Sequence, residues 1–139
     1  MNDSLRRVRL GVAGGLILAS AGRVIDLSWH ARHDEFETGM DQVQAHSVAW
    51  VGATVLLVVS GVALYRRFRT PGFLTVFLSS CLYAPVAVWH FLLHVDGRDP
   101  DLPHILLAVA QLGVYVGSAM VIAGLFIPRC NQRFLAGAT

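Results

Sequence analysis

Six histidines and one aspartate have the spacing of a metal site in this 139-residue chain. Asp26 and His30 are four residues apart, as are His90 and His94, so each pair shares one face of a helix. Imidazole and carboxylate ligands in this number suit copper, zinc or iron, and they argue against magnesium or calcium. Two cysteines are too few for an iron–sulfur cluster or a cysteine-rich zinc module. The pattern therefore predicts a metal site bound mainly by histidine.

The composition indicates which elements must position these residues. Hydrophobic residues make up 55% of the chain and charged residues only 14%, against about 25% charged in an ordinary soluble domain. The mean hydropathy is +0.56. A net charge of +2 gives no sign of nucleic-acid binding, so we expect no nucleic-acid partner. These values predict an all-α integral membrane protein, with residues 1–139 forming a single domain.

Four apolar stretches are long enough to cross a bilayer, which takes about 20 helical residues. We place these spans at 8–29, 45–65, 72–94 and 104–127. The first contains a short apolar run, from Leu10 to Gly22, and must include Arg23 and Asp26 to cross the bilayer. The same N-terminal pattern also fits a signal peptide cleaved after Ala19-Ser20-Ala21. We expect the segment to be retained as the first of four spans.

The charged residues set the direction of the spans. Arginines lie before the first span, in the 66–71 loop and after the fourth span. Loops 30–44 and 95–103, in contrast, are rich in acidic residues. By the positive-inside rule, both termini and the 66–71 loop are cytoplasmic. Short connections make neighbouring helices antiparallel, which predicts an up-down four-transmembrane-helix bundle. We expect a bacterial inner membrane protein whose acidic loops face the periplasm or exterior.

This topology delivers the polar side chains to one layer at the extracytoplasmic end of the bundle. The candidate metal ligands are Asp26, His30, His46, His90, His94 and His104. His33 ranks last, because its charged neighbours suit a solvated loop residue. Asp26 could instead only pair with Arg23, and His94 could be an interfacial residue. Five or six ligands suit either one enclosed ion or one ion in each half of the chain.

Four further side chains are expected to support this site. Arg23 lies three residues before Asp26 and would offset and orient its carboxylate. Helical spacing from the histidines projects Tyr83, Gln111 and Tyr115 towards the same face, where they would line the approach of a substrate. The tryptophans at 29, 50 and 89 are better explained as an aromatic belt at the membrane interface.

The two halves of the chain look like a repeat. Trp29-His30 ends the first span and His46 begins the second, while Trp89-His90 is followed by His104 at the start of the fourth. Duplication of a helical hairpin would give two similar half-sites across a pseudo-twofold axis. The halves are not identical, because Asp26 corresponds to Val86.

These spaced residues resemble the paired metal sites in the C subunit of particulate methane and ammonia monooxygenases. The positions that match the two sets of the family are Asp26, His30 and His46, followed by His90 and His104. The resemblance implies copper held within transmembrane helices and an oxidoreductase setting. The asparagine of the family falls on Val86, so the second set is incomplete unless His94 replaces it.

Several functions remain open from the sequence. The first is a membrane metalloprotein that acts on a small or lipid-soluble substrate and is monooxygenase-like if it is an enzyme. It could form a homo-oligomer or assemble with other membrane subunits. The second is a metal transport, sensing or chaperone protein that holds copper or zinc without catalysis. A haem-b electron carrier is the third, because helical bundles can present histidine pairs to haem iron. The fourth is a membrane scaffold with interfacial histidines.

Overall fold

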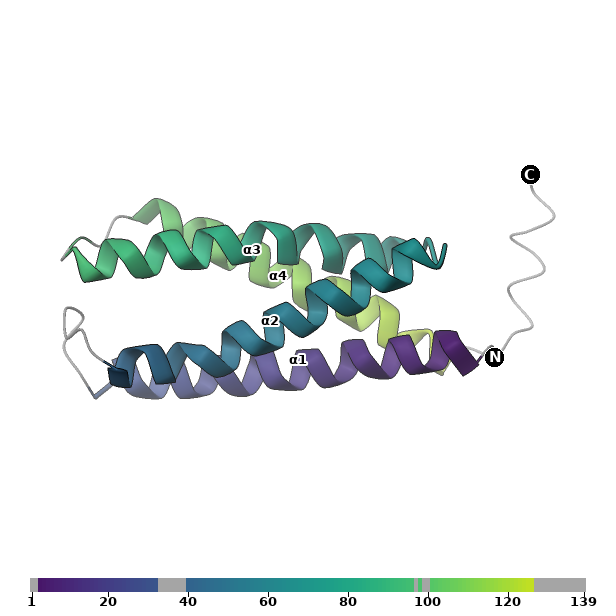
Figure 1. Ribbon diagram of the computed structural model, residues 1–139, viewed down its shortest axis with the longest axis horizontal. Coiled ribbons are helices and arrows are strands. Elements are labelled where there is room, and N and C mark those ends of the chain that lie inside the picture. Colours follow the sequence, from purple (N-terminus) through teal and green to yellow (C-terminus); the bar gives the residue numbers. More distant parts are fainter. Residues whose placement is uncertain (1–2, 33–39, 97, 99–100, 127–139) are drawn as a thin grey trace.

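The computed structural model describes residues 3–32, 40–96, 98 and 101–126 (Figure 1). The helices are α1 (Asp3–His30), α2 (Met40–Tyr65), α3 (Pro71–Val95) and α4 (Asp101–Ala123). Turns and short loops make up the rest of the described residues, so the predicted all-α fold with four helices is confirmed.

The helices follow the predicted spans with differences at their ends. α1, α2 and α4 begin three to five residues earlier than predicted, at Asp3, Met40 and Asp101, because polar residues outside the apolar run continue the helix. α4 ends at Ala123, and the predicted end at 127 lies outside the described residues.

The four helices cross the bundle in alternating directions (Figure 1). α1 packs most extensively against α2, and α3 against α4, while α2 contacts α3 and α1 contacts α4 less extensively. In the described part of the chain, the diagonal pairs α1–α3 and α2–α4 make no backbone contact. The helices therefore surround a central axis as two closely packed hairpins. We call the end where α1 and α3 finish the histidine end, and the opposite end the arginine end.

Small residues allow the backbones within each hairpin to touch. A Cβ added at Gly22 of α1 would lie 2.1 Å from the backbone nitrogen of Ala49 in α2. In the second hairpin, a Cβ on Gly117 of α4 would lie 2.8 Å from the backbone nitrogen of Val76 in α3. Small-residue contacts of this kind drive helix association in membranes, where burying apolar surface gives little gain.

The apolar core lies towards the arginine end. Its buried members come from the first halves of α1 and α3 and the second halves of α2 and α4: Val8, Val12, Leu56, Ala63, Phe73, Val76, Val114 and Val121. Towards the histidine end the buried residues include the polar side chains of Asp26 and His94. The two ends are therefore built differently, one closed by apolar packing and the other lined by polar groups.

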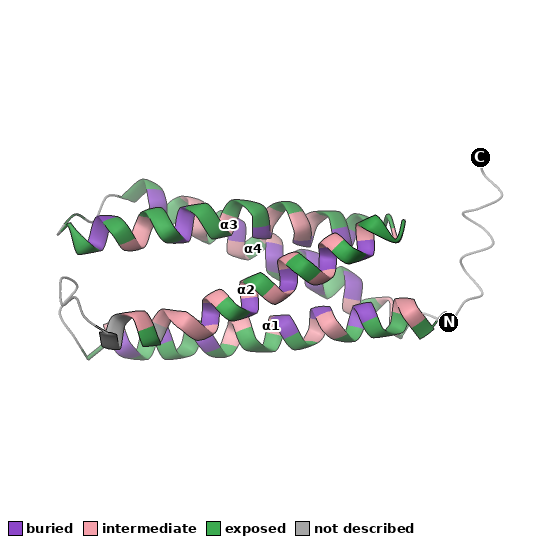
Figure 2. Ribbon diagram, in the orientation of Figure 1, coloured by how far each residue is buried: buried purple, intermediate pink, exposed green. Residues whose placement is uncertain are grey.

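The outward faces of the helices are apolar. Figure 2 shows exposed residues along the outside of every helix, and many of these are large hydrophobic side chains. On α4 alone they form a continuous stripe of Ile105, Val109, Leu112, Val116 and Met120. A soluble monomer rarely exposes so large an apolar surface. Together with four helices long and apolar enough to cross a membrane, this surface indicates a multi-pass membrane protein.

Two arrangements close the arginine end. Arg9 of α1 is buried, and its Nη1 donates a hydrogen bond to the carbonyl oxygen of Gly124, just beyond α4. This places a cation at the negative end of the α4 dipole. Between α2 and α3, Arg67 adopts a left-handed backbone conformation (φ 63°), and the amide of Phe68 donates to the carbonyl of Ala63 at 2.9 Å. These bonds satisfy carbonyls that the end of α2 would otherwise leave unpaired.

Candidate metal centre

A cavity of about 350 Å³ lies at the histidine end and is lined by all four helices. Its polar lining consists of Arg23, Asp26, His30, His46, Tyr83, His90, His94, His104 and Gln111. Apolar side chains, among them Leu27, Trp50 and Leu107, complete the wall. The six predicted metal ligands therefore share one cavity.

The first hairpin supplies the Asp26 group, which we define as Asp26, His30 and His46. Asp26 is buried, with only 6% of its side chain exposed. Its Oδ2 accepts a hydrogen bond from Nη1 of Arg23. Its Oδ1 lies 3.1 Å from Nε2 of His46 and 3.4 Å from Nε2 of His30. One carboxylate oxygen is thus held by a cation, while the other faces two imidazole nitrogens.

The position of Asp26 Oδ1 is compatible with a metal ligand. The oxygen is fully buried, and among the described residues it has no hydrogen bond, although it lies within ion-pair distance of both imidazoles. A buried carboxylate oxygen without a hydrogen bond is costly unless a cation compensates it. The three possible ligand atoms of the group lie within 4.8 Å of one another, so one ion could bind all three. Two histidines and one carboxylate form a common ligand set for transition metals.

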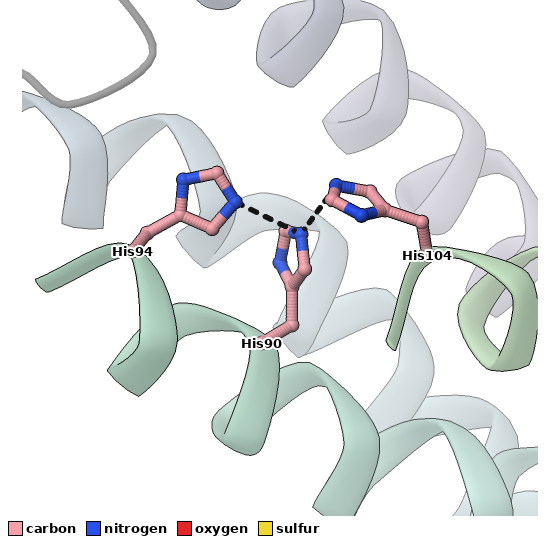
Figure 3. Close-up of side chains that lie close together, drawn as sticks. All are labelled: His90, His94 and His104. Carbon is pink, nitrogen blue, oxygen red and sulfur yellow. Dashed lines mark hydrogen bonds between the residues drawn. The ribbon is translucent and has the colours of Figure 1, made fainter. Parts of the chain in front are cut away.

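The second hairpin supplies the His90 group, which we define as His90, His94 and His104 (Figure 3). Nε2 of His90 lies 2.8 Å from Nε2 of His104 and 3.1 Å from Nε2 of His94. His94 is buried, His90 is half-buried and His104 is exposed. All three rings point towards one another, with two of them on α3 and the third at the start of α4.

Nε2 of His90 lies within hydrogen-bonding distance of Nε2 of both neighbours, and Figure 3 draws both contacts. A neutral imidazole nitrogen carries either one hydrogen or one lone pair, so Nε2 of His90 cannot donate to one neighbour and accept from the other. One possible ligand atom from each of the three histidines lies within 4.8 Å of the others, so the group could also hold a metal ion. With metal–nitrogen bonds of about 2.0 Å, ligand nitrogens of a tetrahedral site are about 3.3 Å apart. The two separations from Nε2 of His90, 2.8 and 3.1 Å, are slightly shorter than that value.

The two groups approach each other across the bundle axis. The ring centroids of His30 and His94 are 6.2 Å apart, although α1 and α3 make no backbone contact in the part of the chain that the structure describes. His46 also lies near Phe91 of α3, with ring centroids 6.3 Å apart. The cavity therefore contains two neighbouring groups of possible ligands, and the predicted repeat relates His30 to His90 and His46 to His104 but gives Asp26 and His94 no equivalent.

The remaining predicted residues divide into three cases. Tyr83 and Gln111 line the cavity, as expected of residues on the approach. Tyr115 lies deeper, where it lines a smaller cavity with Tyr83 and Gln111, and its hydroxyl accepts a hydrogen bond from Nε2 of Gln111 at 3.1 Å. His33 lies outside the described residues. The sequence analysis assigned Trp50 to an interfacial belt and did not consider Phe91, and the rings of these two residues pack 5.7 Å apart beside His46.

Comparisons with protein-family models, with curated proteins and with solved structures find no match for this chain. The geometry of the two ligand groups is therefore the basis for a functional assignment.

Proposed function

We propose that this protein binds copper in the bilayer and uses it in oxidative chemistry on a small or lipid-soluble substrate. The observation that carries the proposal is the convergence of six ligands, as two groups of three, in one cavity. Nitrogen and carboxylate donors suit copper, zinc and iron alike, and the resemblance to the C subunit of particulate methane and ammonia monooxygenases favours copper.

Two ions, one in each group, fit this ligand arrangement best. The Asp26 group offers a carboxylate whose charge is partly offset by Arg23, whereas the His90 group offers only neutral imidazoles. An ion in the His90 group would therefore keep more of its positive charge, which favours the lower oxidation state of copper there. Three protein ligands in each group leave room for another ligand, as catalytic metal sites require.

The positive-inside rule supports an orientation with both termini in the cytoplasm. Arg6, Arg7, Arg66, Arg67 and Arg69 lie at the arginine end of the bundle. The metal site would then face the periplasm of a bacterial inner membrane, where ions can reach it without crossing the bilayer.

Metal analysis of purified variants tests the proposal. We expect about two copper ions per chain in the parent protein and about one in His30→Ala and in His90→Ala, because each substitution disables one group of ligands. His33→Ala serves as the control and should keep both ions. Unchanged metal content in all three variants would overturn the proposal. The visible and EPR spectra identify the metal, and an intense Soret band would indicate haem b in its place.

A second candidate, metal transport or delivery without catalysis, is favoured by the exposure of His104. An exposed ligand can exchange ions with a donor or acceptor more readily than a buried one. Retention of a stoichiometric ion through extensive dialysis would argue against this function, and rapid exchange with a soluble chelator would support it.

A further inference from the structure

A further cavity, of about 200 Å³ and distinct from the two described above, lies between α2 and α3 beside the metal cavity. Its lining consists of Trp50, Ala53, Thr54 and Leu57 from α2, and Tyr83, Ala84, Ala87 and Val88 from α3. Trp50, Tyr83 and Ala87 line both cavities, so the two volumes share a wall. We call this further cavity the α2–α3 window.

The α2–α3 window is bounded along the bundle axis by aromatic contacts. On the histidine side, the rings of Trp50 and Phe91 pack edge to face with centroids 5.7 Å apart. On the arginine side, Phe77 lies against Gly61, where an added Cβ would be 3.4 Å from its ring. Between these two contacts several of the facing side chains are small, among them Ala53, Ala84 and Ala87, and they leave room for the cavity.

The α2–α3 window opens outward and is apolar. Thr54, Ala84 and Val88 are exposed on the outer surface, at a level that the proposed orientation places within the bilayer. The hydroxyl of Thr54 donates to the carbonyl oxygen of Trp50 at 2.8 Å, so it offers little polarity to a ligand. A lipid-soluble molecule that enters here therefore meets an apolar wall, and the helical backbone groups behind that wall stay hydrogen-bonded within the helices.

The inner side of the α2–α3 window is polar. Tyr83 lines the window and the metal cavity, and Gln111 lies across the metal cavity on α4. Arg23 lines the metal cavity from α1, and its side chain is 44% exposed. A charged guanidinium makes that side of the cavity unfavourable for an apolar molecule, because placing such a molecule there would desolvate the charge.

We propose that the α2–α3 window binds a hydroxyl-headed amphiphile that enters from the bilayer. Its apolar tail lies among Ala53, Ala84 and Val88, and its hydroxyl lies at Tyr83, facing the metal cavity. Ligand sites of about 300–1,000 Å³ are typical for small molecules, and the two adjoining cavities together fall in this range. The inference rests on the proposed function and names its substrate class as a lipid-soluble alcohol.

Fluorescence quenching by ω-bromo-octanol tests the inference. In a Trp29→Phe/Trp89→Phe background, Trp50 is the remaining tryptophan and reports on the α2–α3 window. We expect quenching that saturates and that unbrominated octanol reverses. Ala84→Phe should abolish the saturable part by filling the window, and Thr54→Phe should do so from the opposite helix. Ala119→Phe, at an exposed position on α4, is the matched control and should leave it unchanged.

A second arm tests the hydroxyl. Tyr83→Phe should weaken the binding of ω-bromo-octanol by about 3- to 10-fold, as the loss of one hydrogen bond predicts, but leave the binding of bromo-octane unchanged. Quenching that rises linearly with bromo-octanol in the bilayer, equally in Ala84→Phe and Ala119→Phe, would overturn the inference. Metal content is measured on the same samples, so saturable quenching without metal would refute only the proposed function.

Discussion

Replacing Arg23 tests whether the charged residue beside the metal site orients a ligand or only balances a charge. The guanidinium holds Oδ2 of Asp26, and this bond leaves Oδ1 facing His30 and His46. In Arg23→Leu the carboxylate is free to rotate away from the two imidazoles. The same substitution also removes a positive charge, which by itself would favour a cation.

These two effects have opposite signs, and their sizes decide the outcome. Loss of a group that orients a metal ligand weakens binding by about 10- to 100-fold, or about 1.4–2.8 kcal/mol. Because the Arg23 side chain is 44% exposed, water screens its repulsion of the ion. Two unit charges 4 Å apart interact by only about 1 kcal/mol in water. The difference is about 0.4–1.8 kcal/mol, so we expect Arg23→Leu to bind copper about 2- to 20-fold more weakly.

Competition between the purified protein and a copper chelator measures this change. Arg98→Leu is the matched control, because Arg98 pairs with Asp96 at the same end of the bundle but both side chains are exposed. The control should bind copper as tightly as the parent. Arg23→Lys keeps the charge without the two-pronged guanidinium and should fall between parent and Arg23→Leu. Tighter binding by Arg23→Leu would refute the orienting role and show that charge repulsion dominates.

The remaining predictions concern the bundle itself. Gly22→Ala should destabilise the protein by about 3 kcal/mol, because the new Cβ would collide with the backbone of Ala49, whereas Gly14→Ala, which meets open space, should stabilise it by about 1 kcal/mol. Arg67→Gly should raise the free energy of unfolding by about 1 kcal/mol, since glycine adopts the left-handed conformation without strain. Thermal unfolding in detergent measures all three. In a cysteine-free background, Thr38→Cys should react with an impermeant thiol reagent outside intact cells, and failure to react would contradict the proposed orientation.

Hydropathy predicted the number of helices and their approximate bounds, because an apolar run of about 20 residues has few alternatives to a spanning helix. It could not predict the starts of α1, α2 and α4, where Asp3, Met40 and Asp101 begin helices outside the apolar runs. Helical backbone hydrogen bonds form through polar residues as well as apolar ones. A method that locates helices by their hydropathy therefore misses the polar ends.

Helical spacing predicted which side chains meet, but not how they divide. Four-residue spacing and helix direction were enough to bring Asp26 and the histidines to one cavity. The separation into an Asp26 group and a His90 group depends on the close backbone contacts within each hairpin, such as that between Gly22 and Ala49. Small residues are frequent in every span, so their partners could not be assigned from the sequence. The role of Trp50 in the cavity wall was missed because an interfacial tryptophan has the same sequence pattern.

The uneven packing along the bundle also has a mechanical consequence. The two hairpins are fastened at one end by the apolar core and by Arg9 on Gly124, and they are separated at the other by a cavity. Each hairpin is therefore a lever about 30 Å long from Arg9 to His30. A rotation of about 2° at the fastened end changes the spacing between His30 and His94 by about 1 Å. An ion or substrate that draws the two groups together would therefore tilt whole helices, and the change of angle would reach the arginine end of the bundle.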